Sequence, residues 1–543
     1  MPPGTPAPPA SSAPPRPAVP RPASRPGRRA GRPAQPRLLT AAAVGVALVL
    51  AIPLVFLLIE AAGSGAGADA QLIFRPLTAT LLWNTVQLTV VVTALCAVIG
   101  TAAAWCVERT SLPGRKVWAV LIVVPLAIPD FVVSFGWASL WSWIHGFRGA
   151  VVVMTLAVYP LVYLPVAASL RGVDPGQEEV ARSLGTSRLR TFTRITLGQA
   201  RGAILGGCLL VAMVLLAEYG AFEIVGYQTF TTEIFTEINE AFSLPAACAL
   251  ALVLVLLSMV VLAGEGLSRG RGRVSRSGAL AQRVSPPQRL GRARWPVLAG
   301  FVLLTGLALG VPVAASVYWM TSGVRPSLTG VPLLAAAGYT ALYGALAGAL
   351  ATLMALPVAL LAVRHPGGLA RRVLERSTYL VLAIPGVVIA LALSYFTQRY
   401  LGGFAYQTGP LLILAYAIMF FPLALVGVKA SLARAPVSLD EVARSLGQSR
   451  LAVALRVTLR LTGPGLAAAF CLVFLSVITE LTATLILIPT GVQTLATQFW
   501  AYETNLSYAQ AAPFALVMIA VAAIPSIVLG RFFNRSADPG MVT

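Results

Sequence analysis

Charge is scarce in this chain of 543 residues, because only 11% of them are Asp, Glu, Lys or Arg, whereas a soluble globular protein carries about 25%. Histidine is scarcer still: His145 and His365 lie far apart, which argues against a His-based metal site or a Ser/His nucleophile. The five cysteines show no paired spacing, so we interpret them as small buried hydrophobes rather than disulfide partners or zinc ligands. Apolar residues make up 57% of the chain, and this balance is typical of a membrane protein.

The charge that is present is mostly positive, with a formal net value of +21. In nucleic-acid-binding proteins, basic residues form a patch that contacts phosphates and is often interleaved with aromatic side chains. Here they lie in short stretches between apolar runs, so we expect no nucleic acid as a partner. Residues 1–37 consist mainly of Pro, Ala, Ser and Arg, contain no acid, and are expected to be a disordered leader.

Twelve apolar segments follow, most of them near the roughly 20 residues that a helix needs to cross a bilayer. The first is too long for the apolar core of a cleaved signal peptide, so we expect it to remain as a span. The chain is therefore predicted to be all-α, a polytopic membrane protein with about twelve transmembrane helices. The predicted spans are 38–59, 81–105, 117–140, 149–170, 202–222, 245–263, 296–319, 335–362, 377–398, 409–430, 464–487 and 509–530.

Positive charge is divided unevenly between alternate connecting segments. With the N-terminus in the cytoplasm, 36 of the 40 Lys and Arg residues fall on the cytoplasmic side, and only Arg75, Arg148, Arg325 and Arg399 lie outside. Cytoplasmic segments of membrane proteins are enriched in Lys and Arg. Both termini are therefore predicted to be cytoplasmic.

An eleven-residue polar sequence occurs twice, 262 residues apart, as EVARSLGTSRL at 179–189 and EVARSLGQSRL at 441–451. A repeat this close predicts two homologous halves. With six spans in each, the halves share one orientation and are related by an axis along the membrane normal. The predicted boundaries are a cytoplasmic leader 1–37, a first half 38–263, a basic cytoplasmic linker 264–295, a second half 296–530 and a cytoplasmic tail 531–543.

Each copy is predicted to form a helix, a glycine turn and a second helix. We name residues 171–201 the first elbow and residues 433–463 the second elbow. Asp174-Pro175 is expected to start the first helix in one copy, and a capping box from Ser438 to Glu441 in the other. Gly185 and Gly447 are expected to turn the chain through a left-handed conformation, after which Ser187 and Ser449 cap the second helices. Because exposed loops diverge readily, their near identity predicts a docking surface.

The elbows resemble the Glu-Ala-Ala loop of inner-membrane permeases of binding-protein-dependent ABC importers, a loop that inserts into a groove on the ATPase subunit. The resemblance covers residues 38–530 and implies the type I importer fold. Two departures are Val180 and Val442, where the family has alanine, and Gly198 and Arg460, where it has proline. The residues assigned to ATPase docking are Glu179, Ala181, Arg182, Gly185, Glu441, Ala443, Arg444 and Gly447.

The chain contains no Gly-x-x-x-x-Gly-Lys-Ser/Thr phosphate loop, so we expect it not to be an enzyme and to bind no cofactor. The resemblance implies that ATP and Mg are used by a separate ATPase, present in two copies because the elbow is duplicated. It also implies an extracytoplasmic substrate-binding protein, a location in the bacterial inner membrane, and alternating access by rocking of the halves.

Acidic residues at membrane depth are costly and are therefore candidates for the transport path. Asp130, Glu218 and Glu480 fall in predicted spans, where carboxylates could offer oxygen ligands to a hard cation; alternatively they lie at the outer interface, cap helix ends or bind the carrier protein. No ligand set for a metal is apparent. The outer segment after the fifth span has no Lys or Arg and supplies candidate binding-protein contacts in Glu223, Glu233, Glu237 and Glu240.

The fused layout, Glu218-Tyr219-Gly220 and the segment 229–233 resemble the ferric iron permeases, with thiamine permeases as the closest rival. The function expected from the resemblance is passage of ferric iron, or else of thiamine or another small solute. An ATP-independent secondary transporter is an alternative from another class, although it would have no reason to retain the elbow twice. No catalytic constellation of a membrane enzyme and no filter of a channel is apparent.

Overall fold

The computed structural model describes residues 37–63, 73–171, 180–181, 183–269, 288–322, 330–364 and 381–537. Their regular secondary structure is helical, apart from one isolated β-bridge between Thr110 and Gln288. This agrees with the all-α prediction. The predicted leader up to residue 36, most of the linker and the last six residues of the tail lie outside the described residues.

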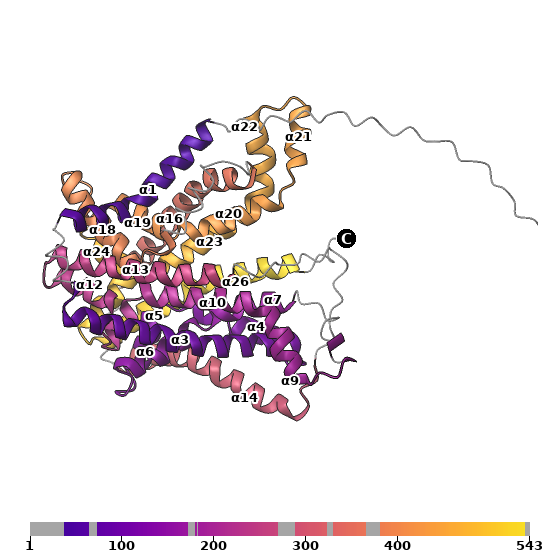
Figure 1. Ribbon diagram of the computed structural model, residues 1–543. Helices are drawn as coiled ribbons and strands as arrows, with labels where there is room; N and C mark the ends of the chain where they lie inside the picture. Colours follow the sequence, from indigo (N-terminus) through magenta and orange to yellow (C-terminus); the bar gives the residue numbers. More distant parts are fainter. Residues whose placement is uncertain are drawn as a thin grey trace, which may run out of the picture.

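The chain of helices is interrupted at matching places in its two halves (Figure 1). The first half contains α1 (Arg37–Gly63), α3 (Pro76–Arg109), α4 (Arg115–Leu121), η1 (Val124–Ala127), α5 (Asp130–Ala138), α6 (Gly146–Val158), α7 (Pro160–Arg171), α9 (Arg188–Thr191), η2 (Phe192–Thr196), α10 (Leu197–Ala217), α11 (Gly220–Ile224), α12 (Phe230–Asn239) and α13 (Leu244–Arg269). The second half contains η3 (Gly291–Ala293), α14 (Arg294–Thr305), η4 (Gly306–Gly310), α15 (Val311–Ser322), α16 (Gly330–Arg364), α18 (Gly386–Tyr400), α19 (Gly409–Met419), α20 (Phe421–Arg434), α21 (Val437–Ser445), α22 (Arg450–Val453), η5 (Ala454–Thr458), α23 (Leu459–Ile478), α24 (Thr482–Leu487), α25 (Leu495–Thr504) and α26 (Tyr508–Ala537).

Among the described residues, 8 helices are long and apolar enough to cross a membrane, or up to 10 if each of two bent pairs is one span. The first pair joins Arg115–Ala127 to Asp130–Ala138 at 91°, and the second joins α19 to α20 at 58°. Prolines start the second member of each pair or precede it, and proline removes a backbone donor and disfavours a continuous helix. The predicted spans 117–140 and 409–430 are therefore bent rather than straight.

Two predicted spans extend too far. The helices of the spans at 202–222 and 464–487 end at Ala217 and Ile478, and short helices α11 and α24 follow in a new direction. The prediction failed because the apolar run continues past each break. The breaks are produced by Glu218 and Glu480, whose geometry is described below.

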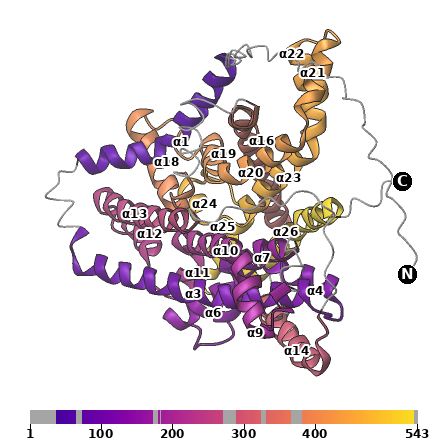
Figure 2. The same cartoon turned by 45° about the vertical axis from the view of Figure 1, so that its right-hand side comes forward.

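The first helices of each half, α1 in one and α14–α15 in the other, pack against the opposite half. One hydrophobic core combines α3, α5–α7, α10 and α11 with residues of α14, η4, α25 and α26, and the other combines α16, α18–α20 and α23 with residues of α1, α12 and α13. Figures 1 and 2 show α1, in indigo, beside the orange helix α18 of the other half. Reciprocally, α15 packs on α5, and the Trp118 and Phe301 rings of α4 and α14 lie 5.5 Å apart. Each half is thus completed by the other.

A close crossing between the halves depends on Gly136. A Cβ at this position in α5 would lie 2.6 Å from the Cα atom of Pro312 in α15, a backbone atom that cannot move aside by rotation. Small residues at helix crossings let backbones approach, which matters in a membrane where packing drives association. Gly300, on α14, has no atom within 4 Å of the corresponding position.

We predict that Gly136→Ala lowers the thermal midpoint of the detergent-purified chain, because overpacking costs about 1–3 kcal/mol. The matched variant Gly300→Ala should leave the midpoint unchanged or raise it slightly, since alanine favours a helix over glycine by about 1 kcal/mol. Equal midpoints for the two variants would contradict this account of the crossing.

Candidate functional site

Both elbows turn at their glycines by the same backbone geometry. Gly185 and Gly447 have φ values of 78° and 81°, the left-handed conformation that was predicted. In the first elbow Thr186 N donates to Ala181 O at 3.1 Å, and in the second Gln448 N donates to Ala443 O at 3.1 Å. These bonds from beyond the glycine back into the last helical turn satisfy carbonyls that the helix end leaves free.

The second helix of each elbow begins at the predicted serine. Ser187 Oγ accepts from Arg190 N at 3.4 Å, and Ser449 Oγ accepts from Ala452 N at 3.2 Å. Each helix then passes through one π-helical turn, η2 or η5, before α10 or α23 continues. The sequence did not predict these π turns, although they lie at the same 262-residue spacing as the repeat. Their duplication makes the two elbows equivalent beyond the repeated eleven residues.

The start of the second elbow differs from the prediction. Helix α21 begins at Val437 with Pro436 as its N-cap residue and no side-chain cap. The capping box from Ser438 to Glu441 is therefore wrong, because Pro436 already fixes a backbone conformation that leads into the helix. The corresponding start at Asp174-Pro175 lies outside the described residues.

The predicted docking residues divide into exposed and buried groups. Glu441, Arg444 and Gly447 are exposed, Ala443 is half-buried, and Ala181 is buried with 8% of its surface accessible. Gly185 is exposed, whereas Glu179 and Arg182 lie outside the part of the chain that the structure describes. Glu441 and Arg444 thus lie together on the open side of α21.

Sequence reasoning overlooked an apolar component of the same surface. Val180 and Leu184 are 58% and 78% exposed, and their counterparts Val442 and Leu446 are 54% and 76% exposed. Large exposed apolar side chains beside charged ones are typical of a protein interaction site. The signal that could have revealed them was their identity in both copies of the repeat.

Glu218 and Glu480 lie at equivalent helix breaks and make the same side-chain hydrogen bond there. Glu218 Oε1 accepts from Ala221 N at 2.8 Å and Glu480 Oε1 accepts from Ala483 N at 3.0 Å, so each carboxylate caps the short helix that follows. Their main-chain oxygens also accept hydroxyls, from Thr231 and Thr484 respectively. Helix capping was one of the predicted alternatives, and these hydrogen bonds agree with it.

The segments that carry Asp130, Glu218 and Glu480 meet where the halves join. A Cβ on Gly220 would lie 2.7 Å from Leu481 Cδ2 and 3.1 Å from Phe131 Cβ, so the residues next to the three acids are packed together. In the second half Gly386 occupies the place of Asp130, and a Cβ there would lie 3.7 Å from Glu480 Oε1. A small cavity beside Glu480 is lined by Thr340, Tyr343, Tyr416 and Thr494, among others. Among the described residues, no three His, Cys, Asp or Glu side chains form a group that could hold a metal ion.

The four acids predicted to contact the binding protein are not all exposed. Glu237 is buried and its carboxylate lies 2.7 Å from Arg75 Nη2, whereas Glu223 and Glu240 are exposed and Glu233 is half-buried. Burial and the neighbouring Glu237 raise the pKa of Glu233, while Arg75 lowers it. Burial and Glu240 raise the pKa of Glu223. Sequence reasoning missed Glu503 of α25, where burial and Glu223 raise the pKa to about 7.

Membrane-length helices, two equivalent elbows and acidic side chains at the junction of two halves define a multi-pass membrane transport component. The chain belongs to the family of binding-protein-dependent transport system inner membrane components, whose model matches residues 97–266 and 351–543, once in each half. It is therefore a permease component of the inner membrane and not an enzyme.

Three relatives show how the likeness is distributed. The chain is 35% identical over 92% of its length to the Fe(3+)-transport system permease protein FbpB 2 of Haemophilus influenzae, 98% of which is covered. It is 28% identical over 40% of its length to the sulfate transport system permease protein CysT of Salmonella typhimurium, 86% of which is covered. It is 29% identical over 26% of its length to the molybdenum transport system permease protein ModB of Escherichia coli, 69% of which is covered.

We predict that substitutions of Gly447 destabilise the turn in proportion to how poorly the new residue tolerates a positive φ. No atom lies within 4 Å of a Cβ built there, so strain comes only from the positive φ, which costs about 1–2 kcal/mol for most residues and less for Asn. Amide hydrogen exchange over residues 437–453 should accelerate more in Gly447→Val than in Gly447→Asn. Gly463→Ala, also without neighbours but in ordinary helix, is the control and should exchange like the original chain.

Proposed function

We propose that this chain passes ferric iron from an external binding protein to the cytoplasm by alternating access, driven by separate ATPase subunits. The observation that supports it most is the duplication of one exposed elbow, with the same turn, cap and π turn, in a chain of the permease family. Because the elbows lie at the ends of α10 and α23, movement of a docked subunit would be transmitted into both halves. ATP and Mg would be used by the ATPases, two copies per chain.

The choice of iron is supported by the likeness to a ferric permease along almost the whole chain and by the chemistry near the junction of the halves. Ferric iron is a hard cation that prefers carboxylate and hydroxyl oxygens. Asp130, Glu218 and Glu480, with the hydroxyls around Glu480, would offer such oxygens along the proposed path between the halves. Thiamine or another small solute is the second candidate, since sulfate and molybdenum permeases also resemble parts of the chain.

We further propose that both termini, the linker and the elbows face the cytoplasm of a bacterium, because 36 of the 40 basic residues then lie on that side. The binding protein would dock on the opposite side, at Glu223, Glu233 and Glu240. Glu237 would act there indirectly, because it pairs with Arg75 at the start of α3 and holds α12 against it. Glu503 would add a negative charge from the second half.

Reversing the elbow charges tests ATPase docking. Glu179→Lys combined with Glu441→Lys should abolish uptake and loosen ATPase co-purification, while the permease stays in the membrane at its normal level. Arg399→Gln, which removes an exposed charge outside both elbows, should transport normally. Normal uptake with intact ATPase co-purification in the double variant would contradict the docking proposal. Uptake that survives ATP depletion would favour a secondary transporter.

The cargo is tested separately, by titrating the companion binding protein with ferric iron, with and without chelators, and with thiamine. Tight ferric binding is the expected result. Binding of thiamine, or of neither ligand, would rule out iron as the proposed substrate while leaving the permease assignment in place.

External pH should affect docking of the binding protein through Glu503. A pKa raised to about 7 means that this carboxylate is mostly ionised at pH 8 and mostly protonated at pH 6, so negative charge is lost as the pH falls. Affinity should therefore drop about two- to fivefold from pH 8 to pH 6, the scale of one exposed ion pair. Glu503→Gln should reduce this dependence, whereas Glu240→Gln should weaken binding at both pH values and retain more of the dependence.

A further inference from the structure

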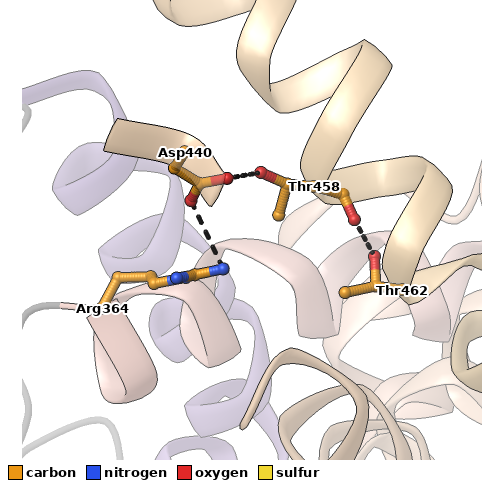
Figure 3. Close-up of polar contacts among 4 residues, drawn as sticks. All are labelled: Arg364, Asp440, Thr458 and Thr462. Carbon is orange, nitrogen blue, oxygen red and sulfur yellow. Dashed lines mark hydrogen bonds and ion pairs between the residues drawn. The ribbon is translucent and has the colours of Figure 1, made fainter. Parts of the chain in front are cut away.

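A buried ion pair ties the second elbow to the end of a long membrane helix (Figure 3). Asp440, on α21 beside the exposed Glu441, places Oδ2 3.4 Å from Nη2 of Arg364, the last residue of α16. The other oxygen, Oδ1, accepts from Thr458 Oγ1 at 3.0 Å. Thr458 is the final residue of the π turn η5, so one carboxylate joins both helices of the elbow to α16.

The connection continues into the membrane helices. Thr458 O accepts from Thr462 Oγ1 at 2.8 Å, and Thr462 O accepts from Ser431 Oγ at 3.0 Å. Ser431 belongs to α20, and Thr462 to α23. The elbow is thereby linked by polar contacts to the three helices α16, α20 and α23, which also pack against one another.

Among the residues that the structure describes, Asp440 places a compensating charge beside Arg364. Both side chains are only 10% exposed, and within the described part of the chain the three guanidinium nitrogens of Arg364 have no hydrogen-bond acceptor. A buried charge is stable only beside a compensating one. The position of α21 is therefore constrained by a requirement for charge neutrality and not only by shape.

The first half has an arginine at the equivalent place. Thr85 of α3 accepts the N-terminal amide of α12 from Phe230 at 3.4 Å, and Thr340 of α16 accepts that of α25 from Leu495 at 2.9 Å, which fixes the register of the two long helices. In that register Arg364 corresponds to Arg109, the last residue of α3. By the spacing of the repeat, Asp440 corresponds to Glu178, an acid as well.

We propose that Arg364 and Asp440 are positioning residues that hold the second elbow rigidly on α16, so that displacement of the elbow by a docked ATPase moves α16, α20 and α23 together. This inference rests on the proposed function, because it assumes that the ATPase docks on the elbow. Glu441 and Arg444 would provide the contact with the ATPase, while Asp440 would pass the movement on. Loss of the pair should leave docking intact and separate ATP hydrolysis from transport.

The test uses the full chain assembled with its ATPase and binding protein in proteoliposomes, and measures ferric iron taken up per ATP hydrolysed. Asp440→Asn retains an oxygen for Thr458 but removes the charge, and should lower this ratio about tenfold while ATPase co-purification stays normal. Because it leaves Arg364 unbalanced, the variant could also fold poorly. The decisive variant is therefore Asp440→Asn with Arg364→Met, which leaves no unpaired charge and should recover thermal stability but not coupling.

Arg399→Gln is the control, since Arg399 has 62% of its side chain exposed and pairs with Glu60 at 3.7 Å outside both elbows, and it should couple normally. A double variant that couples like the original chain would overturn the proposal, as would a double variant that fails to fold, because the pair would then serve stability. If the original chain itself shows no ATP-dependent uptake, the proposed function fails instead.

Discussion

A helix that ends leaves backbone groups that need new partners, and within the membrane hydrocarbon offers none. The structure meets this constraint twice with the same residues in each half. At Gly185 and Gly447 the turn returns hydrogen bonds to the preceding helix, and at Glu218 and Glu480 a carboxylate caps the next one. Specific hydrogen bonds therefore end the helices at the elbows and at the junction of the halves, which are the regions proposed to take part in transport.

Because the first helices of each half pack against the opposite half, a movement at one of these interruptions affects both halves. Helix α1 packs against α16 and α18, and α15 packs against α5, so neither half can move without taking helices of the other along. The aromatic contacts of Phe499 with Phe131 and Phe135, at 5.4 and 5.3 Å between ring centres, hold the same junction. Displacement of an elbow would therefore be expressed as a change between the halves, around the three acids that lie there.

The sequence predicted the helical class, the duplication and both glycine turns, since hydrophobic run length and positive-φ preference are local properties of a few residues. It predicted spans that are too long at Ala217 and Ile478, because an apolar run does not reveal that a carboxylate will cap a new helix within it. The pairs Arg364–Asp440 and Arg75–Glu237 depend on residues 76 and 162 positions apart along the chain. Only the packing of the helices brings such residues together, and a single sequence carries no mark of it.

The duplicated elbow is the centre of this account, and it makes a claim about stoichiometry that one measurement can settle. Native mass spectrometry of the complex purified through a tag on this chain should show two ATPase subunits for each copy of the chain. A complex with one ATPase, or a chain that is isolated without any under conditions where the binding protein stimulates uptake, would contradict the equivalence of the two elbows.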